Sequence, residues 1–224
     1  DHRDLHSFPT RRSSDLLNKI LKEQAPRYLA VVFDAKGPNF RHELYPDYKA
    51  NRPPMPEELR VQQEPIREIV RAMGLAIVEK PGLEADDLVA VLARKAVEEG
   101  FEAVIVAGDK DYYQLLSDRV TLYDPNPKRE TRMTPAALME KLGLRPSEFL
   151  EAQGLMGDSA DNIPGAPGVG EKTAVKLIQE FGTLEKLFQN LDRIPQARLR
   201  AKLEEHKEDR KSTRLNSSHG KLYR

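Results

Sequence analysis

Two apolar runs rich in β-branched residues, each followed by acidic residues, constrain the fold of this chain most. Residues 28–33 lead directly into Asp34, and residues 103–108 lead into Asp109 and Asp111. Runs of this kind are typical of strands buried on both faces of a parallel sheet with helices between them. The sequence therefore predicts an α/β fold. Ligand sites in such sheets lie outside the carboxyl ends of the strands, which is where these acids are expected.

A second acidic feature lies at residues 82–87, where a loop leads into an apolar helix. Glu84, Asp86 and Asp87 place three carboxylates within four residues. A helix N-terminus favours each negative charge by only about 0.3–1 kcal/mol, which does not offset their mutual repulsion. A hard divalent cation such as Mg²⁺ would offset this repulsion, because it binds carboxylate oxygens. The alternative is an acidic first helical turn with Glu84 near the N-cap, and this stretch alone does not decide between them.

The turn-rich segment 157–162 adds Asp158 and Asp161. Taken singly, each acid in the chain could instead cap a helix or form an Asx turn. Taken together, eight carboxylates at strand ends, helix starts and turns favour a metal site: Asp34, Glu84, Asp86, Asp87, Asp109, Asp111, Asp158 and Asp161.

Composition limits the class of protein. The 224 residues include no cysteine, which excludes disulfides and thiolate zinc sites and fits a reducing cytosol. No apolar run approaches the roughly 20 residues that span a bilayer, and no signal-peptide pattern opens the chain, so we expect a soluble protein. The formal net charge is zero. With the eight clustered acids set aside, however, residues 17–208 carry four more basic than acidic side chains, so a metal-filled site would leave a protein that can meet phosphate.

Segment 37–56 combines cations with aromatic rings. Such interleaving suits a phosphate backbone with unstacked bases, because the rings stack and the cations neutralise charge. A solvated loop is the alternative. The residues concerned are Arg41, His42, Tyr45, Tyr48, Lys49 and Arg52.

Residues 163–174 form a glycine-rich segment that opens a helix at Gly170. Glycines permit a tight turn, and the free N–H groups of a helix start can point at an anion. A second helix at 184–188 would complete a helix-hairpin-helix, although a plain Gly/Pro loop between helices is the alternative. The Walker spacing is absent, so this is no nucleotide P-loop. The candidate DNA contacts here are Gly165, Gly168, Gly170, Lys172 and Thr173.

The remaining pattern predicts further elements. We expect a helix ending near residue 21, an amphipathic helix over 57–73 closed by Gly74, and a strand at 76–79. A helix over 88–99 leads to the strand at 103–107 as a βαβ unit. Residues 120–123 and 130–133 are expected to pair as a hairpin, and helices follow from Thr134 and over 146–155.

Both ends of the chain look unlike the rest. Residues 1–16 and 209–219 resemble translated sequencing adapters, and a natural disordered tail is the alternative. The expected domains are a non-native tail at 1–16, a catalytic domain at 17–145, a helix-hairpin-helix lobe at 146–208 and a second non-native tail at 209–224.

Six stretches, in order, are similar to one known family. Residues 17–208 closely resemble the 5′-nuclease domains of bacterial DNA polymerases I, in the flap-endonuclease superfamily. The resemblance implies a PIN-like fold: a central, mostly parallel sheet flanked by helices, an arch, and a C-terminal helix-hairpin-helix lobe. The stretches are VVFDAKG at 31–37, YKANRPPMP at 48–56, GLEADD at 82–87, GDKD at 108–111, LMGDSADNIPG at 155–165 and PGVGEKTA at 167–174.

The resemblance also implies an activity. It is 5′ to 3′ removal of nucleotides or 5′ flaps from DNA in repair, replication and RNA-primer removal, by a monomer in the bacterial cytoplasm. Two Mg²⁺ or Mn²⁺ ions would be bound, the first by Asp34, Glu84, Asp86 and Asp87 and the second by Asp109, Asp111, Asp158 and Asp161, with some of these acting through water. Such ions activate a water and stabilise the leaving oxygen. Lys49 and Arg52 would engage phosphates, Tyr48 would lie near unpaired bases, Arg41 would contact DNA, and a K⁺ ion would sit at the hairpin.

The chain departs from the family at its start. The family begins with a strand that carries a further metal-binding Asp and lies beside the Asp34 strand, and adapter-like sequence stands in its place here. The rest of the nuclease domain and any polymerase domain are likewise not expected in this chain. A truncated, inactive module that binds flap DNA is therefore the second hypothesis. An RNA-cleaving PIN relative and an acid-pocket signalling domain are further alternatives.

Overall fold

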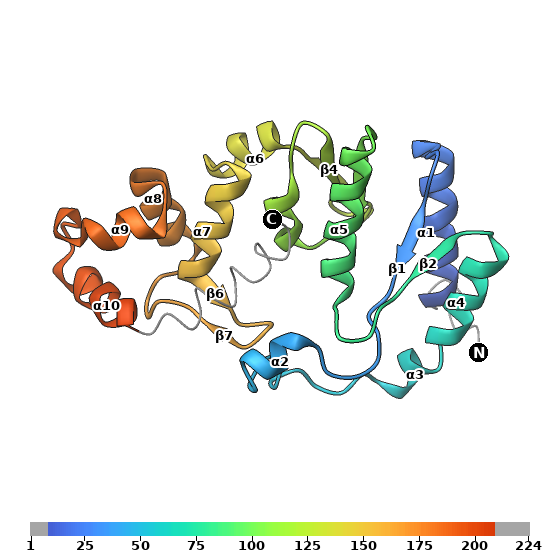
Figure 1. Cartoon of the computed structure of the whole chain (residues 1–224), viewed down its shortest axis with the longest axis horizontal. Helices are drawn as coiled ribbons and strands as arrows, with labels where there is room; N and C mark the ends of the chain where they lie inside the picture. The colour runs from blue at the N-terminus through green and yellow to red at the C-terminus, as the bar shows by residue number, and fades with distance from the viewer. Residues whose placement is uncertain (1–8, 209–224) are drawn as a thin grey trace. The chain divides into compact units, whose positions relative to one another are not determined.

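The structure is a computed structural model that describes residues 9–208. The chain forms two compact units, which are described separately. The first comprises residues 1–37 with 53–88, and the second comprises residues 38–52 with 89–224. Figure 1 labels the principal helices and strands. The tail residues 1–8 and 209–224 lie outside the described part, so the tail predictions are untested there.

The first unit contains a parallel strand pair, as predicted. Strands β1 (Ala30–Val32) and β2 (Ala76–Val78) run side by side in register, with Val31 opposite Ile77. Helix α1 (Pro9–Gln24) confirms the helix predicted to end near residue 21 and begins eight residues before the boundary predicted at 16/17.

The amphipathic helix predicted over 57–73 is two helices, α3 (Glu57–Arg60) and α4 (Gln63–Ala72). The reason is Pro65, whose ring would clash with the carbonyl four residues earlier, so one continuous helix cannot pass through residues 61–65. Pro65 instead lies in the first turn of α4, where its missing N–H is not needed. Gly74 follows α4 with a φ of 70°, which is the left-handed conformation expected of a C-terminal glycine.

The second unit contains a three-stranded mixed sheet. Strand β3 (Ala103–Val106) pairs in parallel with β4 (Val120–Asp124), and β4 pairs antiparallel with β5 (Thr131–Met133), which confirms the predicted hairpin. Helix α5 (Ala85–Glu98) begins in the first unit and belongs to the second from Val89 onward. It precedes β3, and the 3₁₀ helix η2 (Lys110–Leu115) follows β3. Their apolar faces pack with helix α6 (Pro135–Leu142), whose Leu138 is fully buried.

The α/β class is confirmed, and within residues 9–208 the parallel strand pairs fall into two sheets, one in each unit. In residues 9–208 the strands form separate sheets, with β1 hydrogen-bonded only to β2 and β3 only to β4. Each of these parallel strands thus leaves one edge without a strand partner in the described part of the chain.

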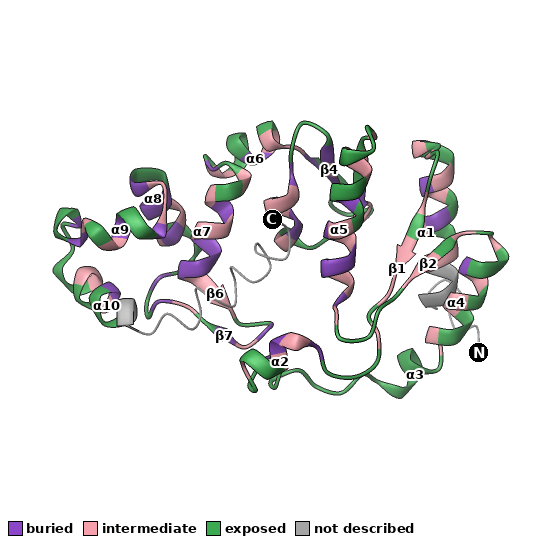
Figure 2. Ribbon diagram, viewed as in Figure 1, coloured by how far each residue is buried: buried purple, intermediate pink, exposed green. Residues whose placement is uncertain are grey.

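The C-terminal lobe is helical, as predicted. It contains α7 (Pro146–Met156), α8 (Glu171–Phe181), α9 (Leu184–Gln189), the 3₁₀ helix η3 (Leu191–Arg193) and α10 (Ala197–Glu208). Helix α7 packs on α8, and Figure 2 shows buried positions along both helices. The short strands β6 (Gly157–Asp158) and β7 (Ile163–Pro164) form an antiparallel pair after α7. The core includes Leu144, Leu155, Ile178, Leu187, Ile194 and Leu203.

Residues 38–52 belong to the second unit although they come early in the chain. Helix α2 (Phe40–Leu44) is capped by Asn39, whose side chain accepts a hydrogen bond from the Arg41 amide at 2.9 Å. The turn that follows α2 returns to the β6–β7 loop through a hydrogen bond from the Lys49 amide to the carbonyl of Asp161. None of the helices in residues 9–208 is both long enough and apolar enough to cross a membrane.

Candidate functional site

The first group of predicted acids serves the start of helix α5. Asp34 follows β1, and its Oδ1 accepts a hydrogen bond from the Ala85 amide at 2.7 Å. Asp87 Oδ2 accepts from the Glu84 amide at 3.0 Å. Glu84 and Asp87 are buried. These carboxylates satisfy amides that a helix start leaves without intrahelical partners.

The acidic helix start described by the local alternative is present, since α5 begins at Ala85 directly after Glu84. A helix-capping role does not exclude a metal-ligating one, because a carboxylate has two oxygens and about four lone pairs. The metal-ligand role of Asp34, Glu84, Asp86 and Asp87 stays a prediction.

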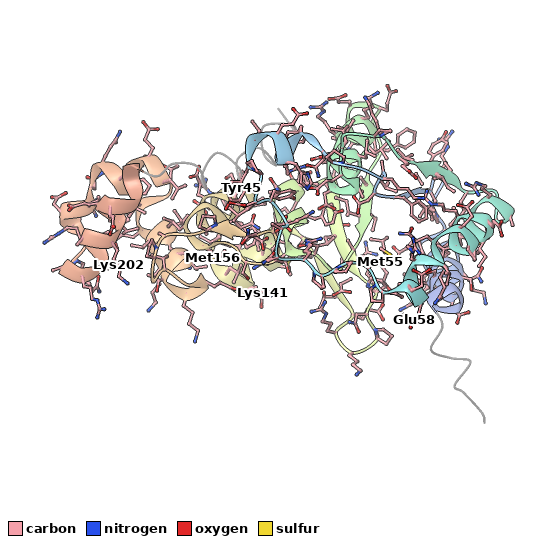
Figure 3. The ribbon with its side chains drawn as sticks, turned by 90° about the horizontal axis from the view of Figure 1, so that it is seen from below. Tyr45, Met55, Glu58, Lys141, Met156 and Lys202 are labelled. Atoms are coloured by element: carbon pink, nitrogen blue, oxygen red, sulfur yellow. The ribbon has the colours of Figure 1, made fainter. Side chains whose placement is uncertain are left out.

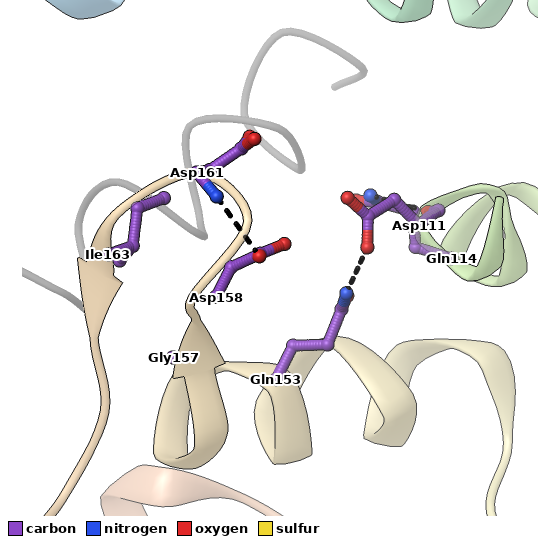
Figure 4. Close-up of a pocket in the computed structure, with 7 residues that line it drawn as sticks. All are labelled: Asp111, Gln114, Gln153, Gly157, Asp158, Asp161 and Ile163. Carbon is purple, nitrogen blue, oxygen red and sulfur yellow. Dashed lines mark hydrogen bonds between the residues drawn. The ribbon is translucent and has the colours of Figure 1, made fainter. Parts of the chain in front are cut away.

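The second group surrounds a small pocket in the second unit. Asp111, Asp158 and Asp161 line this acidic pocket together with Gln114, Gln153, Gly157 and Ile163, as Figure 4 shows. Asp109 caps η2 by accepting from the Asp111 amide at 2.9 Å. Asp158 Oδ1 accepts from the amides of Ala160 and Asp161 at 2.8 and 3.2 Å, which is the Asx-turn pattern considered as the alternative.

Electrostatics distinguish Asp111 from its neighbours. Burial raises the pKa of Asp111 to about 7, and the nearby carboxylates of Asp109 and Asp158 add to the rise, while the hydrogen bond from Gln153 opposes it. A buried carboxylate among like charges is costly to ionise. The arrangement therefore favours a group that brings positive charge into the pocket.

Two glycines hold the turn that carries Asp158 and Asp161. A Cβ on Gly157, whose φ is 67°, would lie 2.2 Å from the Gly165 amide nitrogen, and a Cβ on Gly165 would lie 2.1 Å from the Met156 carbonyl oxygen. Only glycine permits this approach of two backbones. Packing thus gives a structural reason for Gly165, and its predicted DNA contact stays a prediction.

The predicted cations at the end of segment 38–52 contact the carboxylate of Asp161. Arg52 Nη2 donates to Asp161 Oδ1 at 2.6 Å, and Tyr48 Oη donates to Oδ2 at 2.9 Å. Lys49 Nζ lies 3.9 Å from Oδ2. The structure therefore places the predicted phosphate-binding cations beside the predicted metal-binding acids, through residues far apart in sequence.

Two other predicted DNA contacts in this segment are buried. The Tyr48 ring is 1% exposed and packs with Ile163 and Tyr45, the last of which is labelled in Figure 3. The Arg41 side chain is fully buried, with its guanidinium 4.6 Å from the centre of the Phe40 ring. The DNA roles of Tyr48 and Arg41 stay predictions, and stacking of a base on Tyr48 would require the ring to leave this cluster.

The glycine hairpin takes the predicted form. Gly168 has a φ of 79°, and Gly170 is the N-cap of α8, so exposed Lys172 and half-buried Thr173 lie in its first turn. Lys202 of α10, labelled in Figure 3, was missed from the sequence. Its ammonium would lie 2.7 Å from a Cβ on Gly168, so it adds a cation to the hairpin.

Two glutamines in the acidic pocket were also missed. Gln153 Nε2 donates to Asp111 Oδ1, and Gln114 Nε2 donates to the Asp111 carbonyl at 2.9 Å. The Gln114 Oε1 atom is buried and has no hydrogen-bond partner in the part of the chain that the structure describes. No sequence signal marked either residue, because neutral glutamines inside helices carry no pattern of their own.

The donor atoms of the acidic pocket suit a divalent cation. The pocket's carboxylate oxygens are the ligands that Mg²⁺ and Mn²⁺ prefer, and Gln114 Oε1 offers an acceptor for a water on such an ion. Within residues 9–208, no three His, Asp or Glu side chains converge as a ready ligand set. The metal-ligand role of Asp109, Asp111, Asp158 and Asp161 therefore stays a prediction.

Comparison with known proteins assigns the family. Residues 8–143 match the family model of the 5′-3′ exonuclease N-terminal resolvase-like domain, and residues 144–218 match that of the 5′-3′ exonuclease C-terminal SAM fold. The chain belongs to the 5′-3′ exonuclease family.

Relatives of this family are close in sequence. The chain is 50% identical over 195 residues to the thermostable DNA polymerase I of Thermus aquaticus, which covers 87% of this chain and 23% of that protein. It is 44% identical over 196 residues to DNA polymerase I of Bacillus caldotenax, covering 86% and 22%. The chain thus spans less than a quarter of the length of these relatives.

Solved structures share the fold. T5 5′-exonuclease with bound zinc is similar with a TM-score of 0.77 and 22% identity, over 95% of this chain and 83% of that one. The catalytic core of Rad2 in complex with DNA substrate is similar with a TM-score of 0.61 and 18% identity, over 92% and 67%. These likenesses confirm the PIN-like fold of the 5′-3′ exonuclease family with its C-terminal helical lobe.

Proposed function

We propose that this chain is a metal-dependent nuclease that hydrolyses DNA phosphodiesters at a 5′ end or a 5′ flap. Family membership supports this activity. The observation that carries the proposal is the meeting of Lys49, Arg52 and Tyr48 with Asp161 at the acidic pocket. A phosphate at this place would be within reach of both cationic side chains and a carboxylate-bound ion.

Eight carboxylates would hold the metal. We assign Asp109, Asp111, Asp158 and Asp161 to one ion and Asp34, Glu84, Asp86 and Asp87 to another, with Mg²⁺ or Mn²⁺ in each site. Such ions supply a nucleophilic hydroxide and stabilise the leaving oxygen of a phosphodiester. Support comes from structural neighbours, since T5 5′-exonuclease and the T5 D15 protein were both crystallised with metal ions.

The chain's own residues would bind the phosphates. The Arg52 guanidinium and the Lys49 ammonium now face Asp161, and a strand phosphate could exchange for this carboxylate because guanidinium binds both groups in a bidentate manner. Further along the duplex, the amides at the start of α8 and the charges of Lys172 and Lys202 would bind a second phosphate. A K⁺ ion at the hairpin remains part of this proposal.

The direct test is cleavage of a 5′-labelled flap DNA in Mg²⁺. Asp109→Asn with Asp111→Asn should abolish cleavage while DNA binding persists, because the phosphate-binding cations are retained. Asp118→Asn with Asp192→Asn is the matched control, since both acids are exposed and lie outside the acidic pocket. Cleavage retained in the Asp109 and Asp111 double variant would refute the assignment.

One observation favours a second function, a module that binds flap DNA without cutting it. The described residues do not bring three acidic or histidine side chains together as ligands, whereas the cationic segment and the glycine hairpin are both formed. This hypothesis predicts flap binding without turnover, even in Mn²⁺. Cleavage of the flap in Mg²⁺ or Mn²⁺ by the unchanged chain, together with no cleavage by the Asp109 and Asp111 double variant, would exclude this binding-only function.

We further propose that the substrates include an RNA primer on DNA, and that the chain acts as a monomer in the bacterial cytoplasm. The bacterial DNA polymerase I relatives support this setting. A comparison of DNA and RNA flaps tests the primer role and separates it from RNA cleavage alone. Sedimentation of the chain with and without flap DNA tests the monomer.

A further inference from the structure

Asp111 makes hydrogen bonds through three of its groups: the backbone amide, the backbone carbonyl and the side-chain carboxylate. Its amide donates to Asp109, and its carbonyl accepts from Gln114, both within η2 and its cap. Its carboxylate accepts from Gln153, which comes from helix α7. The two main-chain bonds fix where the residue lies, and only the third acts on the oxygens that face the acidic pocket (Figure 4).

Helix α7 is built to present Gln153 to η2. Phe149 and Gln153 are four residues apart and therefore share one face of the helix. The Phe149 ring packs against Tyr113 of η2 at 5.1 Å between ring centres, and Gln153 reaches Asp111 one turn further on. Both α7 side chains are buried. Helix α7 ends at Met156 and leads directly into Gly157 and Asp158, so the same helix carries Gln153 and leads to Asp158 at the pocket.

We propose that Gln153 is a positioning residue, which orients the Asp111 carboxylate toward the ion that Asp111 would share with Asp158. This inference rests on the proposed nuclease function and names a residue that the acidic motifs do not include. The amide is suited to the task because it donates a hydrogen bond and carries no charge. The negative charge of the pocket therefore stays available to the cation.

A lysine at this position would act in the opposite way. Its ammonium could bind the same carboxylate oxygen, but it would cancel one of the charges that attract the ion. An apolar side chain of similar length would leave the carboxylate without the Gln153 amide. The hypothesis thus predicts a graded loss of metal affinity from glutamine to methionine to lysine, which a merely structural link between α7 and η2 does not predict.

The test measures Mn²⁺ binding to the full chain, without DNA, by electron paramagnetic resonance and calorimetry. We expect Gln153→Met to weaken Mn²⁺ binding about 10-fold, as removal of a hydrogen bond to a ligating group does elsewhere, and Gln153→Lys to weaken it further. The matched control is Gln179→Met, because Gln179 also donates its amide, to the Leu142 carbonyl, but lies outside the acidic pocket. Its Mn²⁺ affinity should stay within about 2-fold of the unchanged chain, which is the scatter of independent sites.

A double-mutant cycle with Asp111→Asn isolates the coupling. If Gln153 acts through Asp111, Gln153→Met should cause no further loss of Mn²⁺ affinity once Asp111 is asparagine. An equal loss in both backgrounds would overturn the inference, as would unchanged affinity in Gln153→Met or the absence of Mn²⁺ binding by the unchanged chain. Thermal unfolding of each variant shows whether the fold is intact.

Flap cleavage is scored as a separate arm. Mn²⁺ binding that depends on Gln153, in a chain that cuts no flap, would refute the proposed nuclease and leave the role of Gln153 standing. Cleavage that depends on Asp111, together with a Mn²⁺ affinity that Gln153→Met does not change, would support the proposed nuclease and refute the role of Gln153.

Discussion

The two groups of acids use the same side chain in opposite ways. In the first, Asp34 and Asp87 accept hydrogen bonds from amides at the start of α5, so their carboxylates stabilise the fold as it stands. In the second, burial and the neighbouring carboxylates of Asp109 and Asp158 raise the pKa of Asp111 to about 7. The first group stabilises the fold without a metal. The second group holds like charges together at a cost in folding free energy, and a bound cation would reduce that cost.

The difference shows where a functional group of acids lowers the stability of the fold. Sites that need clustered charge are commonly less stable than their neutralised variants. Substitutions in the two groups should therefore move stability in opposite directions in the absence of metal, and this contrast is open to measurement.

The largest expected effect separates activity from stability in the second group. Asp111→Asn should reduce flap cleavage to background because it removes a negative charge from the proposed metal site. At pH 8 without metal it should raise the free energy of unfolding. A raised carboxyl pKa means that the folded chain binds the proton more tightly, so stability is lost as pH rises from about 4 to about 7, and asparagine avoids that loss. Denaturant unfolding in EDTA, beside an activity assay, measures both. A less stable variant would contradict this reading.

The next effect concerns the turn that holds Asp158 and Asp161. Gly165→Ala would place a Cβ 2.1 Å from the Met156 carbonyl oxygen, so the β6–β7 pair must shift. Overpacking of this kind costs about 1–3 kcal/mol. Chemical denaturation measures this cost.

Its matched control is Gly170→Ala, because a Cβ there meets nothing within 4 Å. The control should lose less stability, about 0.5–1 kcal/mol, because Gly170 is the N-cap of α8 and alanine is a poorer N-cap than glycine. If Gly165→Ala is no less stable than Gly170→Ala, close backbone packing is not the reason for this glycine.

A smaller effect is expected in the first group. Asp87→Ala removes the acceptor of the Glu84 amide and should lower the free energy of unfolding by about 1 kcal/mol, the usual cost of losing a helix cap. The loss should be present in EDTA, which distinguishes it from loss of a metal ligand. Asp118→Ala, at an exposed turn, is the control. Equal stability of the two variants would show that capping by Asp87 contributes nothing.

The smallest expected effect is at the start of α7. Glu148 accepts from the Arg145 amide and guanidinium, and the hydrogen bond to Arg145 lowers the pKa of Glu148. A lowered carboxyl pKa contributes stability at neutral pH that is lost as pH falls through the ordinary range of glutamate. Glu148→Gln should therefore lower the thermal midpoint slightly at pH 7 and have less effect at pH 3. A difference that grows toward pH 3 would contradict the capping role.

The sequence predicted most elements, and its failures have physical causes. Strand runs, helix caps and the glycine hairpin follow local rules, and so β1, β4, α6 and α8 lie where expected. The break between α3 and α4 follows from Pro65 and could have been foreseen. Which strands pair with which could not be read from local pattern, because strand pairing depends on which segments meet in space.

The site was predicted in its charges but not in its contacts. Asp111, Asp158 and Asp161 stood out as acids, and the structure brings all three to one pocket. Gln114, Gln153 and Lys202 were missed because a neutral amide or a single lysine has no distinctive spacing. Tyr48 was expected near bases, and its burial against Ile163 depends on a tertiary contact that an aromatic residue in a basic segment does not reveal.

The measurement that tests the contrast most directly is thermal unfolding of the chain and of Asp111→Asn across a Mg²⁺ titration from EDTA upward at pH 8. Binding of an ion to the folded state stabilises it by about 2.7 kcal/mol at 100 times the dissociation constant. We predict that Asp111→Asn is the more stable protein in EDTA and that the unchanged chain gains far more from Mg²⁺. A parallel response of the two proteins, or an unchanged chain indifferent to Mg²⁺, would contradict the claim that the second acidic group is held for a cation.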